Sequence, residues 1–574
     1  MRAQGRWAAI VPVCALVVLS ARASADGPVR GSCLAVTDES VVLVADTEGD
    51  ALVRVELEQA DRTTRLSLPG APEQVLLLPD GRLAITRRAT SRVSAIDPST
   101  LEITSDVELG IEPFGLALAP DGSELYVTDV QSRHLFALDP SDLSQRWVAP
   151  LRDDDARGIT VSADGRRAYV AHLRAPRISV VDLRRRAQLY SIALPGAPLG
   201  ARQASANRAS SLELSRDGRT LVVAMDVVDP GEVRPRIVCA GYGCRALDAP
   251  PPVAGALALL PLGRGARRPT AERIDVLDPT DVRYDPSGNT YWVSGIGMSG
   301  GAGRSSRYTE CVVPTSRWVV SHHPLASKLR VVPRTQWLCA DGDACGDGSN
   351  AAASEPREVE LGRDEDLFTR MARTLFHVPT DRISRAGLAC QTCHPDGRQD
   401  GQSWTSQVGR LQTPVLAGRL ESTAPYHWHG SARSLEQSIA ETVRRLGGAG
   451  LAADEAQRLA DHLRHGLLPV PRRVANQGDS VAVARGAELF ETLGCPRCHD
   501  PALAYQDGQR YSMLGTAEDP GEPLDVPSLR SLRLGAPYLH DGRARDLGAV
   551  LDGGSMGTRA ASLPPRDRAS LIAF

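Results

Sequence analysis

The pattern Cys-x-x-Cys-His occurs twice in the last third of the chain, at 390–394 and 495–499. The two cysteines of such a string can form thioether bonds with the vinyl groups of a porphyrin, and the histidine can ligate the iron. The chain is therefore expected to bind two c-type haems covalently. The residues concerned are Cys390, Cys393, Cys495 and Cys498 for attachment, and His394 and His499 as proximal ligands. A zinc site or a redox-active Cys-x-x-Cys pair is the alternative use of these residues.

The first 25 residues have the features of a secretory signal peptide. Arg2 and Arg6 precede an apolar stretch at 8–19, and small residues at 23–25 offer a cleavage site. We expect cleavage after Ala25 and a bacterial protein that is periplasmic or secreted. An uncleaved membrane anchor is the alternative, although this apolar run is short for a span of ~20 residues.

Export would also allow disulfides, which persist in oxidising compartments. Six cysteines remain after Cys14 and the four motif cysteines are set aside. They are Cys33, Cys239, Cys244, Cys311, Cys339 and Cys345. The pairs 239–244 and 339–345 could close small loops, and 33–311 would then join the start of the first domain to its end. Six cysteines allow 15 pairings, so this is one arrangement among several.

A short motif recurs between residues 70 and 295, in which a tight turn with glycine separates two alternating strands. Its clearest copy is 115–128, and the turn glycines fall at 81, 122, 165, 218 and 288. A period of about 40–45 residues with several strands per unit is typical of a propeller blade. Residues 30–338 are therefore expected to form an all-β propeller of about seven blades. A β-sandwich with coincidental turns is the alternative.

The run Tyr126-Val127-Thr128 in this motif resembles the repeat of YVTN-type β-propellers. Propellers host many unrelated functions, so the fold assigns none. His322 and His323 are adjacent on a strand and would point to opposite faces, which makes joint metal ligation unfavourable. We expect this domain to serve as a docking surface for a protein partner.

The remaining chain divides into three parts. A linker at 339–357 contains an acidic Cys-flanked loop, which is either a solvated disulfide loop or a Ca²⁺ site. Two mainly α-helical c-type cytochrome domains are expected at 358–472 and 473–574. The chain is thus a multidomain protein, and its net charge of −3 gives no reason to expect a nucleic-acid partner.

The two helical halves are internal duplicates. Each haem motif is followed by a Pro-containing segment, at 413–416 and 526–529, and then by an Ala-Pro-Tyr-x-x-x-Gly loop, at 424–430 and 536–542. Over about residues 358–574 this arrangement resembles the bacterial di-haem cytochrome c peroxidase family, which includes the di-haem enzyme that matures the quinone cofactor of methylamine dehydrogenase.

The resemblance implies that one haem stores an electron while the other, with an open distal side, reacts with hydrogen peroxide. It also implies a Trp between the haems, and Trp428 occupies that position. His427, His429 and Glu441 are candidates for the distal acid or base, since the family's distal Glu has no clear counterpart. Haem 1 lacks an evident Met ligand. Met556 is a candidate sixth ligand of haem 2, with Met513 as the alternative, and His540 is a further candidate ligand.

These features together predict an exported oxidoreductase that reduces hydrogen peroxide with electrons from a small cytochrome c or cupredoxin. The alternatives are a pure electron-transfer cytochrome, an enzyme that matures a cofactor in a partner protein presented by the propeller, and a propeller ligand sensor with the haems as redox readout.

Overall fold

The computed structural model describes residues 30–37, 40–58, 62–231, 237–240, 243–246, 251–263, 265–274, 276–284, 291–297, 310–314, 317–333, 357–363, 365–406, 409–468, 471, 477–512, 523–553 and 558–574. The predicted signal peptide, the acidic Cys loop, Met513 and Met556 lie outside these residues. The chain forms two compact units, of residues 1–229 with 253–365 and of residues 230–252 with 366–574. Within the described part, no helix has the length and apolar character needed to cross a membrane.

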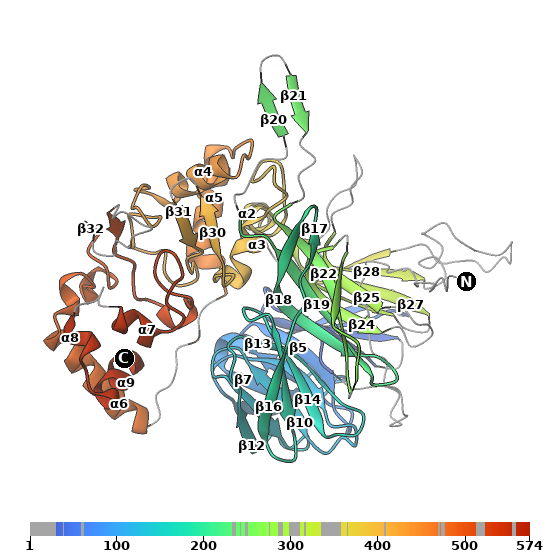
Figure 1. Ribbon diagram of the computed structural model, residues 1–574. Helices are drawn as coiled ribbons and strands as arrows, with labels where there is room; N and C mark the ends of the chain where they lie inside the picture. Colours follow the sequence, from blue (N-terminus) through green and yellow to red (C-terminus); the bar gives the residue numbers. More distant parts are fainter. Residues whose placement is uncertain are drawn as a thin grey trace. The chain divides into compact units, whose positions relative to one another are not determined.

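The first unit is a β-propeller, as predicted, with six blades (Figure 1). Each blade is an antiparallel sheet of four or five strands, listed here blade by blade: β1 (Leu34–Thr37), β2 (Val41–Asp46), β3 (Ala51–Glu56) and β4 (Arg62–Ser67); β5 (Pro72–Leu77), β6 (Leu83–Arg87), β7 (Arg92–Ile96) and β8 (Ile103–Glu108); β9 (Pro113–Leu118), β10 (Leu125–Asp129), β11 (His134–Leu138) and β12 (Gln145–Pro150); β13 (Ala156–Val161), β14 (Arg167–His172), β15 (Arg177–Asp182) and β16 (Ala187–Ala193); β17 (Ala197–Leu199), β18 (Arg202–Leu214), β19 (Thr220–Val228), β22 (Val253–Pro261) and β23 (Thr270–Arg273); β26 (Cys311–Pro314), β27 (Trp318–His323), β28 (Lys328–Pro333) and β29 (Arg357–Glu360).

The expectation of about seven blades was wrong by one. The fifth blade uses strands longer than the repeat implies, since β18 has 13 residues and β19 has 9. Between the fifth and the last blade, the described residues form only a two-stranded sheet of β24 (Val276–Tyr284) and β25 (Tyr291–Gly297). Dividing the domain by a uniform repeat length gave too many blades, because residues 276–297 form two strands and no four-stranded sheet among the described residues.

The repeated turn has a local cause. Gly81, Gly122, Gly165 and Gly218 have φ between +65° and +89°, a region that glycine enters without a Cβ clash. Gly288 lies outside the described residues. After the third strand, Asp97 accepts a hydrogen bond from the amide of Ser99 at 2.8 Å, which closes an Asx turn.

Burial falls from the inner to the outer strand of a blade. All six residues of β9 and of β13 are buried, whereas β4 and β8 contain no buried residue. Apolar side chains of neighbouring blades form shared cores, and one such core joins the first blade to the last. The inner strands therefore carry the packing that holds the blades together.

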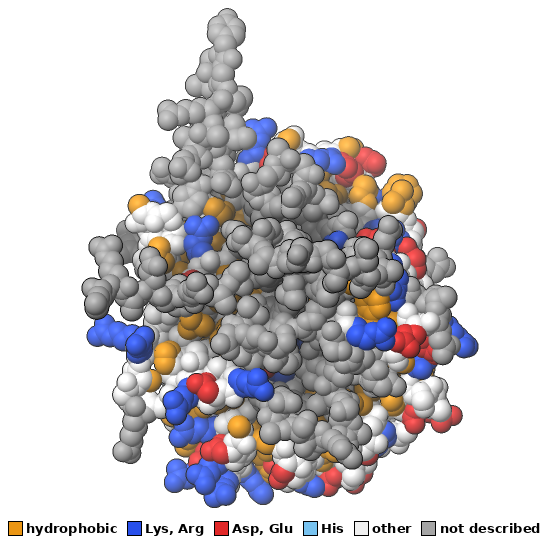
Figure 2. Space-filling view, turned by 90° about the vertical axis from the view of Figure 1, so that its right-hand side faces the viewer, with side chains coloured by type: hydrophobic (Ala, Val, Ile, Leu, Met, Phe, Trp, Pro, Cys, Tyr) orange, Lys and Arg blue, Asp and Glu red, His pale blue; other side chains and the backbone are white. Residues whose placement is uncertain are grey.

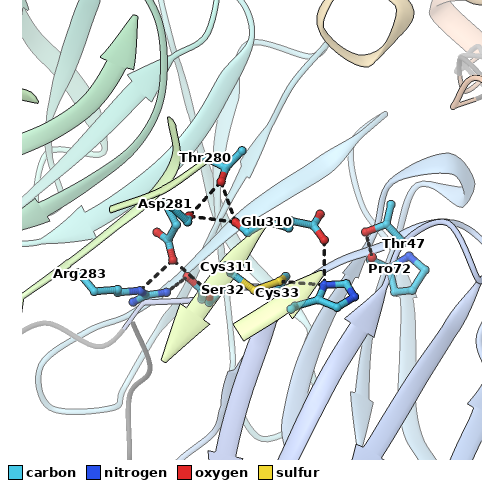
Figure 3. The surroundings of a disulfide bond; sticks show 12 residues. Ser32, Cys33, Thr47, Pro72, Thr280, Asp281, Arg283, Glu310 and Cys311 are labelled. Carbon is cyan, nitrogen blue, oxygen red and sulfur yellow. Dashed lines mark hydrogen bonds and ion pairs between the residues drawn. A yellow bond between two sulfur atoms is a disulfide. The ribbon is translucent and has the colours of Figure 1, made fainter. Parts of the chain in front are cut away.

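A disulfide closes this ring. Cys33, just before β1, is bonded to Cys311 of β26, with Cα atoms 6.1 Å apart (Figure 3). The pairing proposed from sequence for these two cysteines is thus confirmed. Among the described strands no blade combines strands from the two ends of the domain. The closure therefore depends on contacts between the first and last blades: the disulfide, the apolar core beside it, and ion pairs such as that of Arg363 with Asp46.

The segment 30–32 runs across inner strands of other blades. Arg30 bridges to Ala117 of β9, and Ser32 to Val75 of β5. The Arg30 guanidinium is buried and makes ion pairs with Glu213 at 2.6 Å and with Asp281 at 3.0 Å.

The second unit contains the helices and three short strand pairs (Figure 1). Its helices are α2 (Leu367–His377), α3 (Cys390–Cys393), α4 (Leu435–Arg445), α5 (Ala453–Asp461), α6 (Gln477–Thr492), α7 (Leu547–Asp552), α8 (Thr558–Ala561) and α9 (Pro565–Ala573). Its strand pairs are β20 (Ile237–Ala240) with β21 (Gly243–Ala246), β30 (Ser403–Ser406) with β31 (Gly409–Gln412), and β32 (Arg510–Tyr511) with β33 (Leu524–Asp525).

Polar caps begin three of these helices. Asp366, Ser434 and Asp546 each accept hydrogen bonds from amides in the first turn of α2, α4 and α7. One apolar core joins α2, α4 and α5 and includes Phe376, Val443 and Leu459. On the surface, Figure 2 shows acidic and basic side chains interspersed over the described part of one face, in keeping with the small net charge.

Candidate functional site

The first Cys-x-x-Cys-His string forms one turn of helix, α3. The amide of His394 donates to the carbonyl of Cys390 at 2.8 Å, and neither Cys390 nor Cys393 is in a disulfide. The Nδ1 atom of His394 donates to the carbonyl of Arg398 at 3.1 Å, which leaves Nε2 as the ring's acceptor. Burial lowers the pKa of His394 to about 4, so the ring is neutral, as an iron ligand must be.

The second string repeats this geometry in the 3-10 turn η5 (Cys495–Arg497). The amide of His499 donates to the carbonyl of Cys495 at 3.0 Å, and Cys495 and Cys498 are free thiols. The Nδ1 atom of His499 donates to the carbonyl of Tyr505 at 3.1 Å. Burial is the main cause that lowers the pKa of this ring too. Both histidines are therefore fixed by the main chain with Nε2 available for ligation.

The residues around the first string fit a porphyrin better than a zinc ion. Cys390 packs against the apolar core of α2, α4 and α5, and burial raises its pKa to about 12. Among the described residues of the helical unit, no three Cys, His, Asp or Glu side chains converge within metal-binding distance. A zinc site needs four converging ligands, whereas a haem needs thioether cysteines, one axial imidazole and apolar walls.

The two duplicated loops have the same conformation. Both contain a cis Ala-Pro bond, at 424–425 and 536–537. His427 and Leu539 occupy equivalent positions with φ of +70° and +69°. In both loops the tyrosine forms an isolated bridge to an alanine six residues later. The internal duplication seen in the sequence is thus also a structural one.

Each loop packs on the hairpin of the other half. The amide of Asp525 in β33 donates to the carbonyl of Trp428 at 2.9 Å, and the amide of Gln412 in β31 donates to the carbonyl of His540 at 2.6 Å. These two bonds are equivalent under the duplication. The halves therefore exchange their loops across a common interface.

Trp428 and His540 meet at this interface. Their rings are 6.4 Å apart between centroids with an interplanar angle of 68°, which is an edge-on contact. The indole N–H of Trp428 donates to the carbonyl of Gln412 at 2.8 Å. His540 is 4% exposed. Two residues predicted separately from sequence are thereby brought together.

His427 is held against α4 by both ring nitrogens. Nδ1 lies 2.9 Å from the hydroxyl of Ser431 and 3.3 Å from Oε2 of Glu441, and Nε2 lies 2.8 Å from the hydroxyl of Ser438. Burial, and then the charge of Arg445, lowers the pKa of His427. The structure thus joins His427 and Glu441, two of the predicted distal candidates, in one hydrogen-bonded group.

His429, the third candidate, points elsewhere. Its carbonyl accepts from Arg510 of β32 at 3.3 Å, and its Nε2 atom is buried without a hydrogen-bond partner among the described residues. Two candidates for a sixth ligand, Met556 and Met513, lie outside the described residues, and the third, His540, lies buried against Trp428.

Sequence reasoning missed a pair of glutamines. The side-chain amides of Gln399 and Gln506, which are 0% and 6% exposed, donate to main-chain carbonyls of the opposite half, at Ala536 and at Ser422 (3.5 Å). Each belongs to a Gln-Asp-Gly triplet after a haem motif, 399–401 and 506–508. Aligning the sequences of the two halves would have revealed the repeated Gln-Asp-Gly triplet.

The chain was compared with known proteins. No protein-family model matches it. Two curated relatives are the methylamine utilization proteins MauG of Methylorubrum extorquens, 26% identical over 285 residues (38% of this chain and 77% of the relative), and of Methylophilus methylotrophus, 26% identical over 238 residues (32% and 70%).

Two solved structures are similar at low sequence identity. They are hydrazine synthase of Kuenenia stuttgartiensis (TM-score 0.37, 13% identical, 59% of this chain and 81% of that one) and virginiamycin B lyase of Staphylococcus aureus (TM-score 0.36, 12%, 52% and 93%). Both TM-scores are too low to add to the fold described above. The MauG matches confirm, at low identity and over about a third of the chain, the resemblance to the di-haem cytochrome c peroxidase family.

Proposed function

We propose that the chain is an exported di-haem c-type oxidoreductase that reduces hydrogen peroxide with electrons from a small cytochrome c or cupredoxin. The observation that carries this proposal is the pair of equivalent histidines, His394 and His499, each with Nδ1 fixed to a main-chain carbonyl and Nε2 available. The similarity to MauG supports an oxidoreductase with two haems.

Two bound haems would supply one-electron chemistry at two centres, with potentials set by their axial ligands and surroundings. Cys390 and Cys393 would hold the first group, and Cys495 and Cys498 the second. Trp428 lies where the two halves exchange their loops, in contact with His540. This position suits a side chain that passes electrons from one half to the other.

The group of His427, Glu441 and Ser438 suits the proton transfers that peroxide cleavage requires. Helix α4, which carries Glu441 of this group, contributes to the apolar core against which Cys390 of the first string packs. A neutral His427 can accept a proton at one ring nitrogen, while the Glu441 carboxylate stabilises the charge that results. We assign this group, rather than His429, to the distal side of the first site.

Rapid mixing tests the activity. Holoprotein with one of two haems reduced is mixed with millimolar peroxide, and the haem absorbance is followed. We expect a spectral change within the mixing experiment, and a slower one in His427→Gln. His465→Gln is the matched control because His465 is an exposed histidine of the same half. No spectral change in the unsubstituted protein, with two haems confirmed by absorbance and EPR, would contradict the proposal.

A second candidate is oxidation of a residue on a partner protein, with the propeller as the docking platform. The relatives' role in methylamine utilization favours it, since that name implies work on a pathway component rather than peroxide removal. This candidate predicts a stable complex with the partner and slow peroxide turnover without it. Equally fast turnover with and without every periplasmic fraction tested would contradict it.

A further inference from the structure

The disulfide of the propeller has two other metal-binding side chains beside it. His322 of β27 is 0% exposed, and its Nδ1 atom lies 3.6 Å from Sγ of Cys33 and 3.0 Å from Oε2 of Glu310. Glu310 directly precedes Cys311, and its side chain lies beside the disulfide in Figure 3. Of the described residues, Cys33, Cys311 and His322 are the one group of three whose ligand atoms fall within 4.8 Å of one another.

We propose that the reduced form of this site binds a Zn²⁺ ion through Cys33, Cys311, His322 and Glu310. Two thiolates, an imidazole and a carboxylate make a complete tetrahedral donor set for zinc. The site would be a disulfide in the oxidised chain and a zinc site in the reduced chain, and it would pin the first blade to the last in both states.

The distances from Nδ1 of His322 to Sγ of Cys33 and to Oε2 of Glu310 fit tetrahedral coordination of one zinc ion. With Zn–S of about 2.3 Å and Zn–N and Zn–O of about 2.0 Å, tetrahedral angles place S and N about 3.5 Å apart and N and O about 3.3 Å apart. The observed separations are 3.6 Å and 3.0 Å. Once their bond is broken, the two sulfur atoms would have to move to about 3.8 Å from each other, and the Glu310 carboxylate would have to turn towards them.

The surroundings favour a closed site. Cys33 and Cys311 are 6% and 2% exposed, and the core around them contains Leu34, Trp318 and Leu329. Oε2 of Glu310 has no partner among the described residues other than His322. His323, the next residue, faces away and lies 2.9 Å from the hydroxyl of Ser321.

The redox step balances with a dithiol or phosphine as the reductant. The S–S bond takes up two electrons and two protons from the reductant and gives two thiols. Zinc then displaces the two thiol protons as it forms two Zn–S bonds, and those protons go to water. Because zinc binds only the reduced form, it must make reduction of the disulfide more favourable.

The test is a redox titration of the holoprotein with and without zinc. Cys14, Cys239, Cys244, Cys339 and Cys345 are first replaced by Ser, so that Cys33 and Cys311 are the only cysteines outside the two haem motifs. We expect zinc to shift the midpoint potential to a more positive value, and one zinc per chain to remain after gel filtration. Cobalt in place of zinc should give thiolate-to-metal charge-transfer absorption.

His322→Gln should lower the zinc affinity by at least about tenfold, since the loss of a ligand costs no less than the loss of a supporting contact. His323→Gln is the matched control and should bind zinc like the parent. An unchanged midpoint, a disulfide that stays oxidised in both arms, or equal binding by the His322 variant would each overturn the proposal. Haem absorbance and circular dichroism report whether the variants are folded. Peroxide turnover is not a readout, so this result is independent of the proposed function.

Discussion

Trp428 is hydrogen-bonded to Gln412 of its own half, and Gln412 is hydrogen-bonded in turn to the opposite half. The indole N–H of Trp428 donates to the Gln412 carbonyl at 2.8 Å, and the Gln412 amide donates to the carbonyl of His540 at 2.6 Å. The main chain of β31 thus lies between the tryptophan of one loop and the histidine of the other. The position of the indole is fixed by backbone groups, which substitution of neighbouring side chains leaves in place.

Trp428→Phe should slow electron exchange between the haems by at least about tenfold, which corresponds to ~1.4 kcal/mol of barrier. The smaller ring loses both the indole hydrogen bond and part of the contact with His540. Trp404→Phe is the matched control, because it also removes an indole hydrogen bond, to Asp400 at 2.8 Å, but leaves the contact of Trp428 with His540 in place. Flash photolysis of the half-reduced protein measures the rate, and equal rates in the two variants would exclude Trp428 as the path.

The Arg30 ion pairs should contribute strongly to the stability of the propeller. Arg30→Met removes the ion pair of the buried Glu213 and one of the two arginines beside Asp281, which keeps Arg283. We expect a loss of about 3–5 kcal/mol in the free energy of unfolding. Arg317→Met removes an exposed ion pair with Glu58, in which the two side chains are 57% and 56% exposed. This change should lower the free energy of unfolding by less than about 1 kcal/mol. Urea unfolding followed by circular dichroism compares the two. Similar losses would contradict the special role of Arg30.

The disulfide should stabilise the folded propeller because it lowers the conformational entropy of the unfolded chain. It links residues 278 positions apart, and the loop-entropy model gives a loss of about 5.6 kcal/mol when Cys33 and Cys311 are both replaced by Ser. Thermal unfolding with a metal chelator present measures the difference. The same transition in the double variant and the oxidised parent would show that non-covalent contacts alone close the ring.

Acidification should destabilise the helical unit through His462. Burial, and then Arg373, lowers the pKa of His462 to about 4, against ~6.5 in an unfolded chain. The unfolded state therefore binds the proton more tightly, so stability is complete above pH ~6.5 and is lost as pH falls towards 4, by at most about 3 kcal/mol.

His462→Phe should remove this part of the pH dependence. Phenylalanine can keep the edge-on contact with Phe376, where the centroids are 5.7 Å apart, and it removes a buried Nε2 atom that has no hydrogen-bond partner among the described residues. His465→Phe, at an exposed position, should leave the pH profile unchanged. Unfolding free energies measured between pH 7 and pH 4 provide the comparison, and parallel profiles for all three proteins would contradict the assignment.

The propeller was predictable because its turns repeat a local rule: glycine at positive φ between two strands, and aspartate closing the turn after the third. The blade count was not, because β18 and β19 lengthen the fifth blade and the following stretch gives only two described strands. The length of a strand depends on how much of it packs against the neighbouring blade, and the repeat motif does not specify this packing.

The candidate site shows a similar division. The haem strings, the duplicated loops and Trp428 could be found by pattern, since each depends on residue types at fixed spacing. The contact of Trp428 with His540, and the bond from Gln506 to Ser422, join residues more than 80 positions apart in different halves. Only the packing of one half on the other determines such pairs, so a single sequence gives no direct signal for them.

The loop exchange between the halves has a consequence for how the chain can be divided. Each half contributes a loop that satisfies backbone groups of its neighbour, so neither half has a complete set of hydrogen bonds by itself. A backbone cut in the connection at 472–476 would produce two fragments whose exposed hairpins are each other's best partners. Such fragments should reassemble when mixed, whereas either one alone should be poorly folded and bind its cofactor weakly. The duplicated modules are therefore no longer separable units, and they would have to be retained or lost together.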